Sequence, residues 1–442
     1  MDSTKEIGIV ICNYNKEEYI VNCVDSILKS DFQNFDVYVV DNASTDRSVE
    51  LLRKRFGERI KLIVNRENLG GSGGFNTGLR EVMKGTYHYI MCVDNDVIME
   101  REAIRELYEF MEKNPKVGMA GSKICIMDVP DRIQTYGAKI DFEHYLAEDL
   151  YRNYLDDDQI PETVYCDYVP ACSLMARTEA VREVGIMPEE NFIYWDDMEW
   201  GYRFNLAGYL VAAVSASRIW HKRGGAVAKN TFTKYYFFRN RIRFFLKYLA
   251  EDRKEAFARY ILDELYRSVC SCNLKGEYNM MKTFMYAYDD AIHGVLGRAQ
   301  DYKILPRISS NRLADLIENV QSIQIIFNGD YECLGNIIQK LQSIKPKLTY
   351  AICVRDCPKE EEKMKNQYPD ATVVMESCAD CCDLTLKQCS HIFEVQDECK
   401  EGVYIDRWLN LLITKEEFEL GRNFKNSKEL FIEMQLPIVL QG

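Results

Sequence analysis

Two aspartates directly follow an apolar run, in a position where carboxylates can hold a metal ion. Asp94 and Asp96 come after residues 89–93, Tyr-Ile-Met-Cys-Val, which have the composition of a buried strand. In open α/β sheets, ligands bind outside the carboxyl ends of the strands. Two carboxylates this close repel each other unless a cation lies between them, and oxygen ligands facing a diphosphate suit Mg²⁺ or Mn²⁺. The alternative is that the pair only caps a helix.

A second acidic group lies among aromatic side chains. Residues 195–200 read Trp-Asp-Asp-Met-Glu-Trp. Carboxylates among aromatic rings are partly desolvated, so at least one pKa should rise toward the range that a general base needs. Asp197 is therefore a candidate to deprotonate a sugar hydroxyl, and tryptophan offers a flat apolar face for a sugar ring. The alternative is an ordinary solvated helix face, which rarely contains two tryptophans.

The first two expected strands also end in polar residues. The run 7–12 ends at Cys12 and leads into Asn13 and Asn15, and the run 35–40 leads into Asp41. Both ends should open on the same edge as Asp94, where a carboxylate can accept hydrogen bonds from a nucleotide base or ribose. The alternative is that Asp41 only caps a turn.

A glycine-rich segment at residues 66–74, Arg-Glu-Asn-Leu-Gly-Gly-Ser-Gly-Gly, leads into a helix. Backbone N–H groups at such a helix start favour an anionic oxygen. The segment is not a Rossmann fingerprint, because its glycines follow the third strand rather than the first. It is not a Walker A loop, because no Gly-Lys-Ser/Thr follows. The alternative is a flexible turn.

One histidine follows the last expected strand of this region. His221 comes after the run 209–220 and precedes Lys222, Arg223 and two glycines. It could complete a metal shell with Asp94 and Asp96, and Lys222 or Arg223 could neutralise a phosphate. The alternative is a purely structural role, which is more common for a lone histidine.

These groups need an alternating α/β framework to bring them together. Strands are expected at 7–12, 35–40, 60–64 and 87–93, with helices between them, and this order predicts a mostly parallel, doubly wound sheet. Further strands are expected at 134–142, 165–176 and 209–220. A helical pattern covers 231–297, and short apolar runs at 323–327, 349–354, 372–375 and 391–394 predict a small α/β domain after Pro306.

Composition excludes several classes of protein. With 442 residues and 47% hydrophobic content, the chain can bury two or three cores. The formal net charge of −13 argues against general nucleic-acid binding. No stretch approaches the ~18 apolar residues of a membrane span, and the first residues lack the features of a signal peptide. The expected location is therefore the cytoplasm.

Two features leave alternatives open. Residues 234–247 are basic and aromatic with no acid, so this helix could lie on an anionic membrane surface or beside a lipid diphosphate, or pack as a core helix on the sheet. The 16 cysteines are most simply reduced and buried. A structural zinc is conceivable in a late cluster of Cys378, Cys381 and Cys382, joined by Cys357, Cys389 or Cys399, although no second Cys-x-x-Cys exists.

The ordered series of these motifs resembles family 2 inverting glycosyltransferases of the GT-A fold. Within that family it is most similar to the bacterial galactofuranosyltransferase and rhamnosyltransferase branch. The resemblance covers about residues 5–300 and rests on six motifs in order: Asn13-Tyr14-Asn15, residues 40–46, residues 68–74, Asp94-Asn95-Asp96, Trp195-Asp196-Asp197 and Trp220-His221. Tyr235-Tyr236, Arg239-Asn240 and residues 291–294 also fit the branch.

The resemblance implies a role for each matching residue. It implies a divalent metal, Mg²⁺ or Mn²⁺, held by Asp94, Asp96 and His221. It implies Asp197 as the catalytic base, with Trp195 and Asp196 shaping the acceptor site. The nucleotide-sugar site would be formed by Cys12, Asn13, Asn15, Asp41, Arg66, Asn68, Gly70, Asp94 and Asn95. Two positions depart from the pattern: Asn95 stands where aspartate is common, and His293 stands where the branch usually has aspartate.

The expected enzyme transfers a hexosyl or deoxyhexosyl group from a UDP- or dTDP-sugar to a glycan or polyprenyl-diphosphate-linked acceptor, in bacterial cell-surface polysaccharide synthesis. The expected organisation is a GT-A domain over residues 1–230, a helical acceptor-side segment over 231–305 and a small α/β domain of unknown role over 306–442. A sugar-phosphate nucleotidyltransferase and a non-catalytic sugar-binding scaffold are the alternatives. Peripheral membrane contact and homo-oligomerisation stay open.

Overall fold

The computed structural model describes residues 5–157, 159–222, 229–308, 311–354, 358–375, 382–395 and 402–441. The chain divides into two compact units. The first comprises Met1–Ala228, Phe232–Lys254 and Asp289–Tyr302, and the second comprises Lys229–Thr231, Glu255–Tyr288 and Lys303–Gly442. The three-part division drawn from the sequence stays a prediction. In the described residues, no helix is long and apolar enough to cross a membrane.

The first unit is built on a sheet with the strand order β10-β12-β6-β11-β4-β1-β2-β3. One half of the sheet consists of the four strands that the sequence predicted to be mostly parallel, and all of their pairings are parallel. These strands are β1 Ile7–Asn13, β2 Phe35–Asp41, β3 Lys61–Val64 and β4 Tyr89–Asp94. The other half contains β6 Val117–Ile126, β10 Thr163–Cys166, β11 Ser173–Arg177 and β12 Leu210–His221. The antiparallel strand β11 joins the halves by pairing with both β4 and β6. The predicted mixed α/β fold is confirmed.

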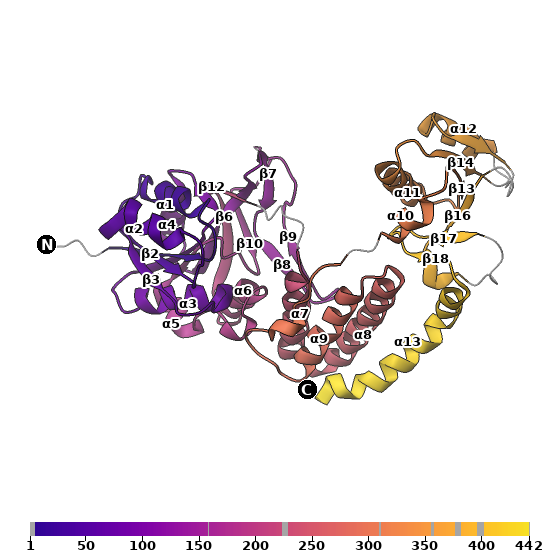
Figure 1. The fold of residues 1–442 in the computed structure, drawn as a ribbon. Helices are drawn as coiled ribbons and strands as arrows, with labels where there is room; N and C mark the ends of the chain where they lie inside the picture. Colours follow the sequence, from indigo (N-terminus) through magenta and orange to yellow (C-terminus); the bar gives the residue numbers. More distant parts are fainter. Residues whose placement is uncertain are drawn as a thin grey trace. The chain divides into compact units, whose positions relative to one another are not determined.

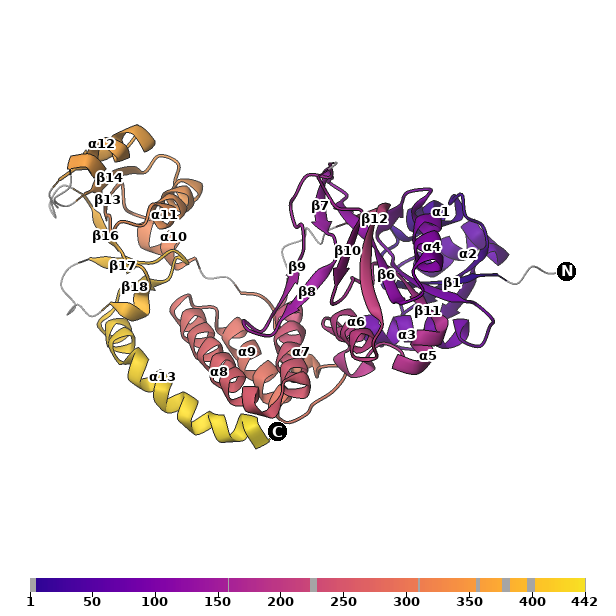
Figure 2. The same cartoon turned by 180° about the vertical axis from the view of Figure 1, so that it is seen from behind.

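Helices cover both faces of this sheet (Figures 1 and 2). On one face lie α1 Ile20–Leu28, α2 Ser48–Phe56 and α4 Ala103–Lys113, and on the other lie α3 Gly70–Val82, α5 Thr178–Val184 and α6 Asp196–Leu206. Successive residues of a strand point to opposite faces, so Ile9 and Ile11 join the first core and Val10 joins the second. Burial on both faces explains the continuous apolar runs.

Two long strands expected from the sequence are each broken in the structure. The expected strand 134–142 consists of the end of β7, Val129–Thr135, and of β8, Ala138–Asp141, separated by Gly137 at φ 75°. The expected strand 165–176 consists of β10 and β11, separated by a turn that contains Pro170. Glycine adopts a positive φ without steric cost and proline lacks a backbone donor, so each interrupts a ladder.

The basic, aromatic helix is α7, Phe232–Tyr248, and most of its large side chains are buried. Tyr235, Tyr236 and Phe245 are at most 1% exposed, and the Arg239 side chain is also fully buried. These observations favour the core-helix interpretation of residues 234–247. Arg223 and its neighbouring glycines lie outside the described residues.

The second unit contains a six-stranded sheet in the order β15-β14-β13-β16-β17-β18, parallel except for the last pair. Its strands are β13 Ser322–Ile326, β14 Thr349–Cys353, β15 Thr372–Val374, β16 Leu384–Gln388, β17 Val403–Ile405 and β18 Leu411–Leu412. Its helices are α10 Arg312–Ile317, α11 Tyr331–Ile344, α12 Pro358–Gln367 and α13 Lys415–Gln441. Most of α8 Glu251–Leu274 and α9 Tyr278–Ile292 also belong here.

One strand expected in this unit is wrong. Residues 392–394 form a 3-10 turn, because the His391 ring accepts a hydrogen bond from the Phe393 backbone N–H at 3.2 Å and caps the turn. The next strand beside β13, on the side away from β14, is β16. It ends at Gln388, before this turn. Of the cysteines considered for zinc, Cys357, Cys378, Cys381 and Cys399 lie outside the described residues.

Candidate active site

Three predicted metal ligands lie together at the carboxyl edge of the first sheet. Asp94 ends β4, Asp96 follows in the turn, and His221 ends β12, where it pairs opposite Val97 of β5 (Val97–Met99). His221 Nε2 is 3.1 Å from Asp96 Oδ1 and 3.8 Å from Asp94 Oδ2. One ligand atom from each residue falls within 4.8 Å of the other two. A candidate acidic metal site therefore exists in this protein.

The charges at this site favour a cation. Burial raises the pKa of Asp94 to about 6, and the nearby Asp96 and Asp197 charges add to the shift, which the charge of His221 opposes. Burial alone would lower the pKa of His221, but its hydrogen bond to Asp96 and the two carboxylate charges raise it. Lys16 Nζ lies 2.7 Å from Asp96 Oδ2. Two carboxylates and an imidazole are a donor set that suits Mn²⁺, and two carboxylates suit Mg²⁺.

The middle residue of the triplet points away from this ligand group. Asn95 is 9% exposed, and its Nδ2 donates to Asn13 Oδ1 at 3.0 Å. Asn13 Nδ2 in turn donates to Asp41 Oδ1 at 2.9 Å, and the Ser44 backbone N–H donates to Asp41 Oδ2 at 2.9 Å. A chain of amide hydrogen bonds thus links the metal edge to the predicted nucleoside residue.

The glycine-rich segment packs tightly against this network. Asn42 Nδ2 donates to Asn68 Oδ1 at 3.0 Å and to the Gly70 carbonyl at 2.8 Å, at the start of α3. A Cβ at Gly74 would lie 2.3 Å from Cys12 Sγ, so only glycine fits there. The segment is therefore a packed helix start, as its glycine pattern predicted, and not the flexible turn that was the alternative.

The other residues that were predicted to bind the nucleotide differ in their burial and hydrogen bonding. Asn15 has φ 51°, and its side chain accepts a hydrogen bond from the Thr45 backbone N–H at 2.8 Å. Asp41 is 1% exposed, and both of its oxygens already accept hydrogen bonds. Arg66 is exposed on the bend after β3. A contact of Asp41 or Arg66 with a nucleotide stays a prediction.

Asp196 and Asp197 open helix α6 after a strained loop. Phe192, Tyr194 and Trp195 have φ values of 65°, 61° and 65°, which are uncommon for non-glycine residues. Asp197 accepts hydrogen bonds from the backbone N–H groups of Ala171 at 3.1 Å and Met198 at 2.9 Å. Such strain persists only where the surrounding structure enforces it, and it gathers at functional sites.

Both aspartates have raised pKa values. Burial is the main cause in each case, and the charge of Asp197 contributes to a pKa of about 7 for Asp196. The carboxylate charge of Asp94 acts on Asp196, and that of Asp197 acts on Asp94. The acid pair and the metal ligands therefore lie close enough to influence each other's protonation. One group of this pair can hold a proton near neutral pH.

A pair of residues that the sequence did not assign to the site holds the strained loop. Asn240 Nδ2 donates to the backbone carbonyls of Asn191 at 2.9 Å, Ile193 at 2.9 Å and Tyr194 at 2.8 Å. Arg239 also donates to the Asn191 carbonyl, at 3.0 Å. The available signal was the Arg239-Asn240 pair in this basic, aromatic helix, which also fits the resembled branch.

The two tryptophans of the motif are core residues. Trp195 is fully buried, and its ring centroid lies 5.0 Å from that of Phe244 and 5.6 Å from that of Phe245. Trp200 is also fully buried, and its Nε1 donates to the Gly185 carbonyl. Trp195 can therefore act on an acceptor only by fixing the backbone of the loop that precedes Asp196.

Part of this chain is similar in sequence to known glycosyltransferases. An uncharacterized glycosyltransferase of Haemophilus influenzae is 25% identical over 213 residues, which are 48% of this chain and 63% of that protein. The glycosyltransferase GlyG of Streptococcus pneumoniae is 25% identical over 231 residues, 51% of this chain and 74% of that protein. The glycosyltransferase GlyA of Streptococcus pneumoniae is 31% identical over 163 residues, 36% of this chain, but the match spans only 22% of GlyA.

A solved structure, S. aureus TarS 1-349 in complex with UDP-GlcNAc, overlaps with 66% of this chain and 81% of that chain, at a TM-score of 0.42 and 18% identity. The sequence match is more direct, because residues 8–181 fit the family described as Glycosyl transferase family 2. That segment carries β1 to β4, the glycine-rich helix start and the Asp94-Asn95-Asp96 triplet. Residues 8–181 of this chain, 174 of its 442 residues, therefore match the glycosyltransferase family 2 model.

Proposed function

We propose that this protein is a metal-dependent, inverting glycosyltransferase that moves a sugar from a nucleotide-sugar donor to a hydroxyl of a glycan or lipid-linked saccharide. One observation carries the proposal. The group Asp94, Asp96 and His221 lies close to a second acidic pair whose pKa values burial has raised. A transferase needs both a site for the leaving diphosphate and a base for the attacking hydroxyl, and these two groups supply them.

Each residue has one task in this reaction. Asp94, Asp96 and His221 would hold Mg²⁺ or Mn²⁺, which when bound offsets negative charge on the leaving diphosphate. Asp197 accepts the proton of the acceptor hydroxyl as that oxygen attacks the anomeric carbon. The nucleoside diphosphate leaves from the opposite face, so one displacement inverts the configuration. The proposed base is positioned by backbone donors on both of its oxygens, at Ala171 and Met198.

Asp196 is the competing candidate for the base, because it is the neighbouring acid whose pKa rises to about 7. Its Oδ2 lies 3.5 Å from the position that a Cβ at Gly71 would occupy, at the start of α3. That location favours a role for Asp196 in binding the donor or the acceptor. The resemblance also implies that Asp196 shapes the acceptor site. Asp197 is therefore retained as the base, and the two assignments can be separated by experiment.

Matched variants provide that experiment. Asp197→Asn should lower transfer about 10³-fold, the effect typical of losing a general base, while thermal shift shows that nucleotide still binds. Asp196→Asn should lower transfer less, and Asp36→Asn, at the start of β2 on the opposite edge of the sheet, should leave it unchanged. Wild-type transfer by Asp197→Asn, or a larger loss in Asp196→Asn, would show that the base is wrongly assigned.

The substrate class is a finer part of the proposal. The resemblance to galactofuranosyltransferases and rhamnosyltransferases implies a hexosyl or deoxyhexosyl donor that is carried on UDP or dTDP. It also implies a role in bacterial cell-surface polysaccharide synthesis. Support comes from Tyr235, Arg239 and Asn240, which are buried and pack against the site loop or the end of α9. His293 does not add support, because it is exposed and bonds only within its own turn.

A screen of UDP-, dTDP- and GDP-sugars tests this part, with thermal shift and product mass as readouts and Mn²⁺, Mg²⁺ or chelator present. The expected result is transfer from a UDP- or dTDP-sugar only with a divalent ion. Product linkage by NMR would show inversion. A sugar 1-phosphate and a nucleoside triphosphate as the sole productive pair would instead indicate the nucleotidyltransferase alternative.

A further inference from the structure

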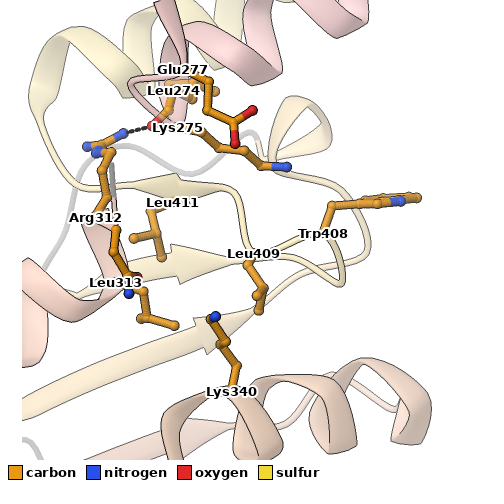
Figure 3. Close-up of a pocket in the computed structure, with 10 residues that line it drawn as sticks. Leu274, Lys275, Glu277, Arg312, Leu313, Lys340, Trp408, Leu409 and Leu411 are labelled. Atoms are coloured by element: carbon orange, nitrogen blue, oxygen red, sulfur yellow. Dashed lines mark hydrogen bonds between the residues drawn. The ribbon is translucent and has the colours of Figure 1, made fainter. Parts of the chain in front are cut away.

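The second unit contains a cavity of about 320 Å³ (Figure 3). It lies between the turn that joins α8 to α9, the helices α10 and α11, and the turn between β17 and β18. Four leucines line it: Leu274, Leu313, Leu409 and Leu411. Ligand sites in proteins are typically cavities of about 300–1,000 Å³ with apolar walls and a few polar groups. This cavity lies at the lower end of that range.

One wall of the cavity is held rigidly in a costly conformation. Trp408 is 51% exposed, and the next residue, Leu409, has φ 61°. The fully buried Asp406 holds this turn, because it accepts hydrogen bonds from the backbone N–H groups of Trp408 at 3.0 Å and Asn410 at 3.0 Å. An exposed indole beside a strained leucine is a preorganised apolar surface, and strained residues of this kind gather at binding sites.

The cavity also has charged groups on opposite sides. Figure 3 shows Lys275 and Glu277 reaching in from the α8–α9 turn and Lys340 from α11. Arg312 has its charge offset, since Nη2 lies 2.5 Å from Glu417 Oε1, and it also donates to the Leu274 carbonyl. Within the part of the chain that the structure describes, Lys340 has no ion-pair partner. The lining therefore includes a cation, Lys340, that has no ion-pair partner among the described residues, in a protein of net charge −13.

These features select a class of ligand. The indole of Trp408 and the leucine side chains can cover the apolar face of a small ring. Glu277 can accept hydrogen bonds from hydroxyl groups, and the Lys340 ammonium can pair with a single acid group. We propose that this cavity is a binding site for a saccharide that carries an acid group, such as a uronic acid or a sugar phosphate.

Tryptophan fluorescence can report this site alone. Of the four tryptophans, Trp195 and Trp200 are fully buried, Trp220 is partly buried and Trp408 is half exposed. Acrylamide should therefore quench mainly Trp408 in the full-length protein, and Trp408→Phe should remove most of the quenchable signal. Glucuronate and glucose 6-phosphate, titrated to about 50 mM, should protect Trp408 from quenching, whereas glucose and inorganic phosphate should not.

Two lysine variants of the same type test the charge. Lys340→Gln removes the cation but keeps a polar side chain with half of the aliphatic stem, so it should weaken protection about tenfold. Lys425→Gln, at an exposed position of α13, is the control and should bind as the wild type does. Saturation-transfer NMR on the wild-type protein provides a measurement that needs no variant.

Each alternative result has a definite meaning. Equal protection by glucose would overturn the acid-group requirement, and equal protection by inorganic phosphate would overturn the saccharide. An equal loss in Lys340→Gln and Lys425→Gln would remove the site from this cavity. If no probe protects Trp408 and none gives a saturation-transfer signal, the proposal is wrong. None of these outcomes depends on transferase activity, so they leave the function proposed for the first unit untouched.

Discussion

Replacing Asn95 with aspartate restores the acid that the family pattern usually has, yet in this protein it should be destabilising. The Asn95 amide is 9% exposed and donates to Asn13 Oδ1 at 3.0 Å. An ionised aspartate has no donor, so two oxygens would face each other and the Asn13 acceptor would lose its partner. Leaving one buried polar group unsatisfied costs about 1–3 kcal/mol.

The new carboxylate would also be buried and adjacent in the chain to Asp94 and Asp96, so its pKa should rise. Burial and like charges that raise it by roughly two units would add about 2.7 kcal/mol at neutral pH. An acid whose pKa is higher in the folded protein than in the unfolded chain destabilises the fold at pH values above the folded-state pKa. Below the unfolded-state pKa this effect is absent, because the acid is protonated in both states. The total loss is therefore about 4–6 kcal/mol at pH 7.5. It should shrink toward about 1 kcal/mol at pH 4, where the protonated acid can donate to Asn13.

The assay is urea unfolding at several pH values in a Trp408→Phe background, with chelator present. The three remaining tryptophans, Trp195, Trp200 and Trp220, all lie in the first unit, so fluorescence follows that unit only. Asn95→Ala is the control: it removes the same hydrogen bond but adds no charge, so its loss should not depend on pH. Equal stability of Asn95→Asp and wild type at pH 7.5, or the same pH slope in both variants, would refute the reasoning.

Two further predictions concern the acid pair and the metal ligands. Asn240→Ala removes an amide whose two N–H groups are shared among three carbonyls of the strained loop, so it should cost about 1–3 kcal/mol and lower transfer with nucleotide binding retained. Asn114→Ala, which loses one bond to a helix carbonyl, is the control, and equal effects would contradict the role of Asn240. Since the pKa of Asp94 is about 6, Mn²⁺ affinity measured by calorimetry should fall about tenfold from pH 7 to pH 5; a flat profile would contradict this.

Much of the first sheet could be predicted because its signals are local. β1, β2 and β4 are apolar runs that end in polar residues, and each of the strands β1 to β4 lies within two residues of its expected bounds. Predictions from local composition were wrong where the backbone conformation decided whether a strand formed. Gly137 and the turn at Pro170 divide two expected strands, and His391 caps a 3-10 turn where a strand was expected. Each of these depends on a backbone conformation or hydrogen bond that a run of apolar letters does not encode.

The sequence by itself determined which chemistry is available at the site. Carboxylates after a buried strand, acids among aromatic residues and a late histidine carry functional groups that are present in any fold, although burial in this fold raises the pKa of the acids. Only the tertiary structure decided which of them meet. His221 reaches Asp96 because β12 pairs antiparallel with β5, and Asn240 reaches the loop before Asp196 because α7 packs beneath it. Strand pairing and helix packing join residues far apart in the chain, and such contacts follow from the whole core rather than from any local pattern.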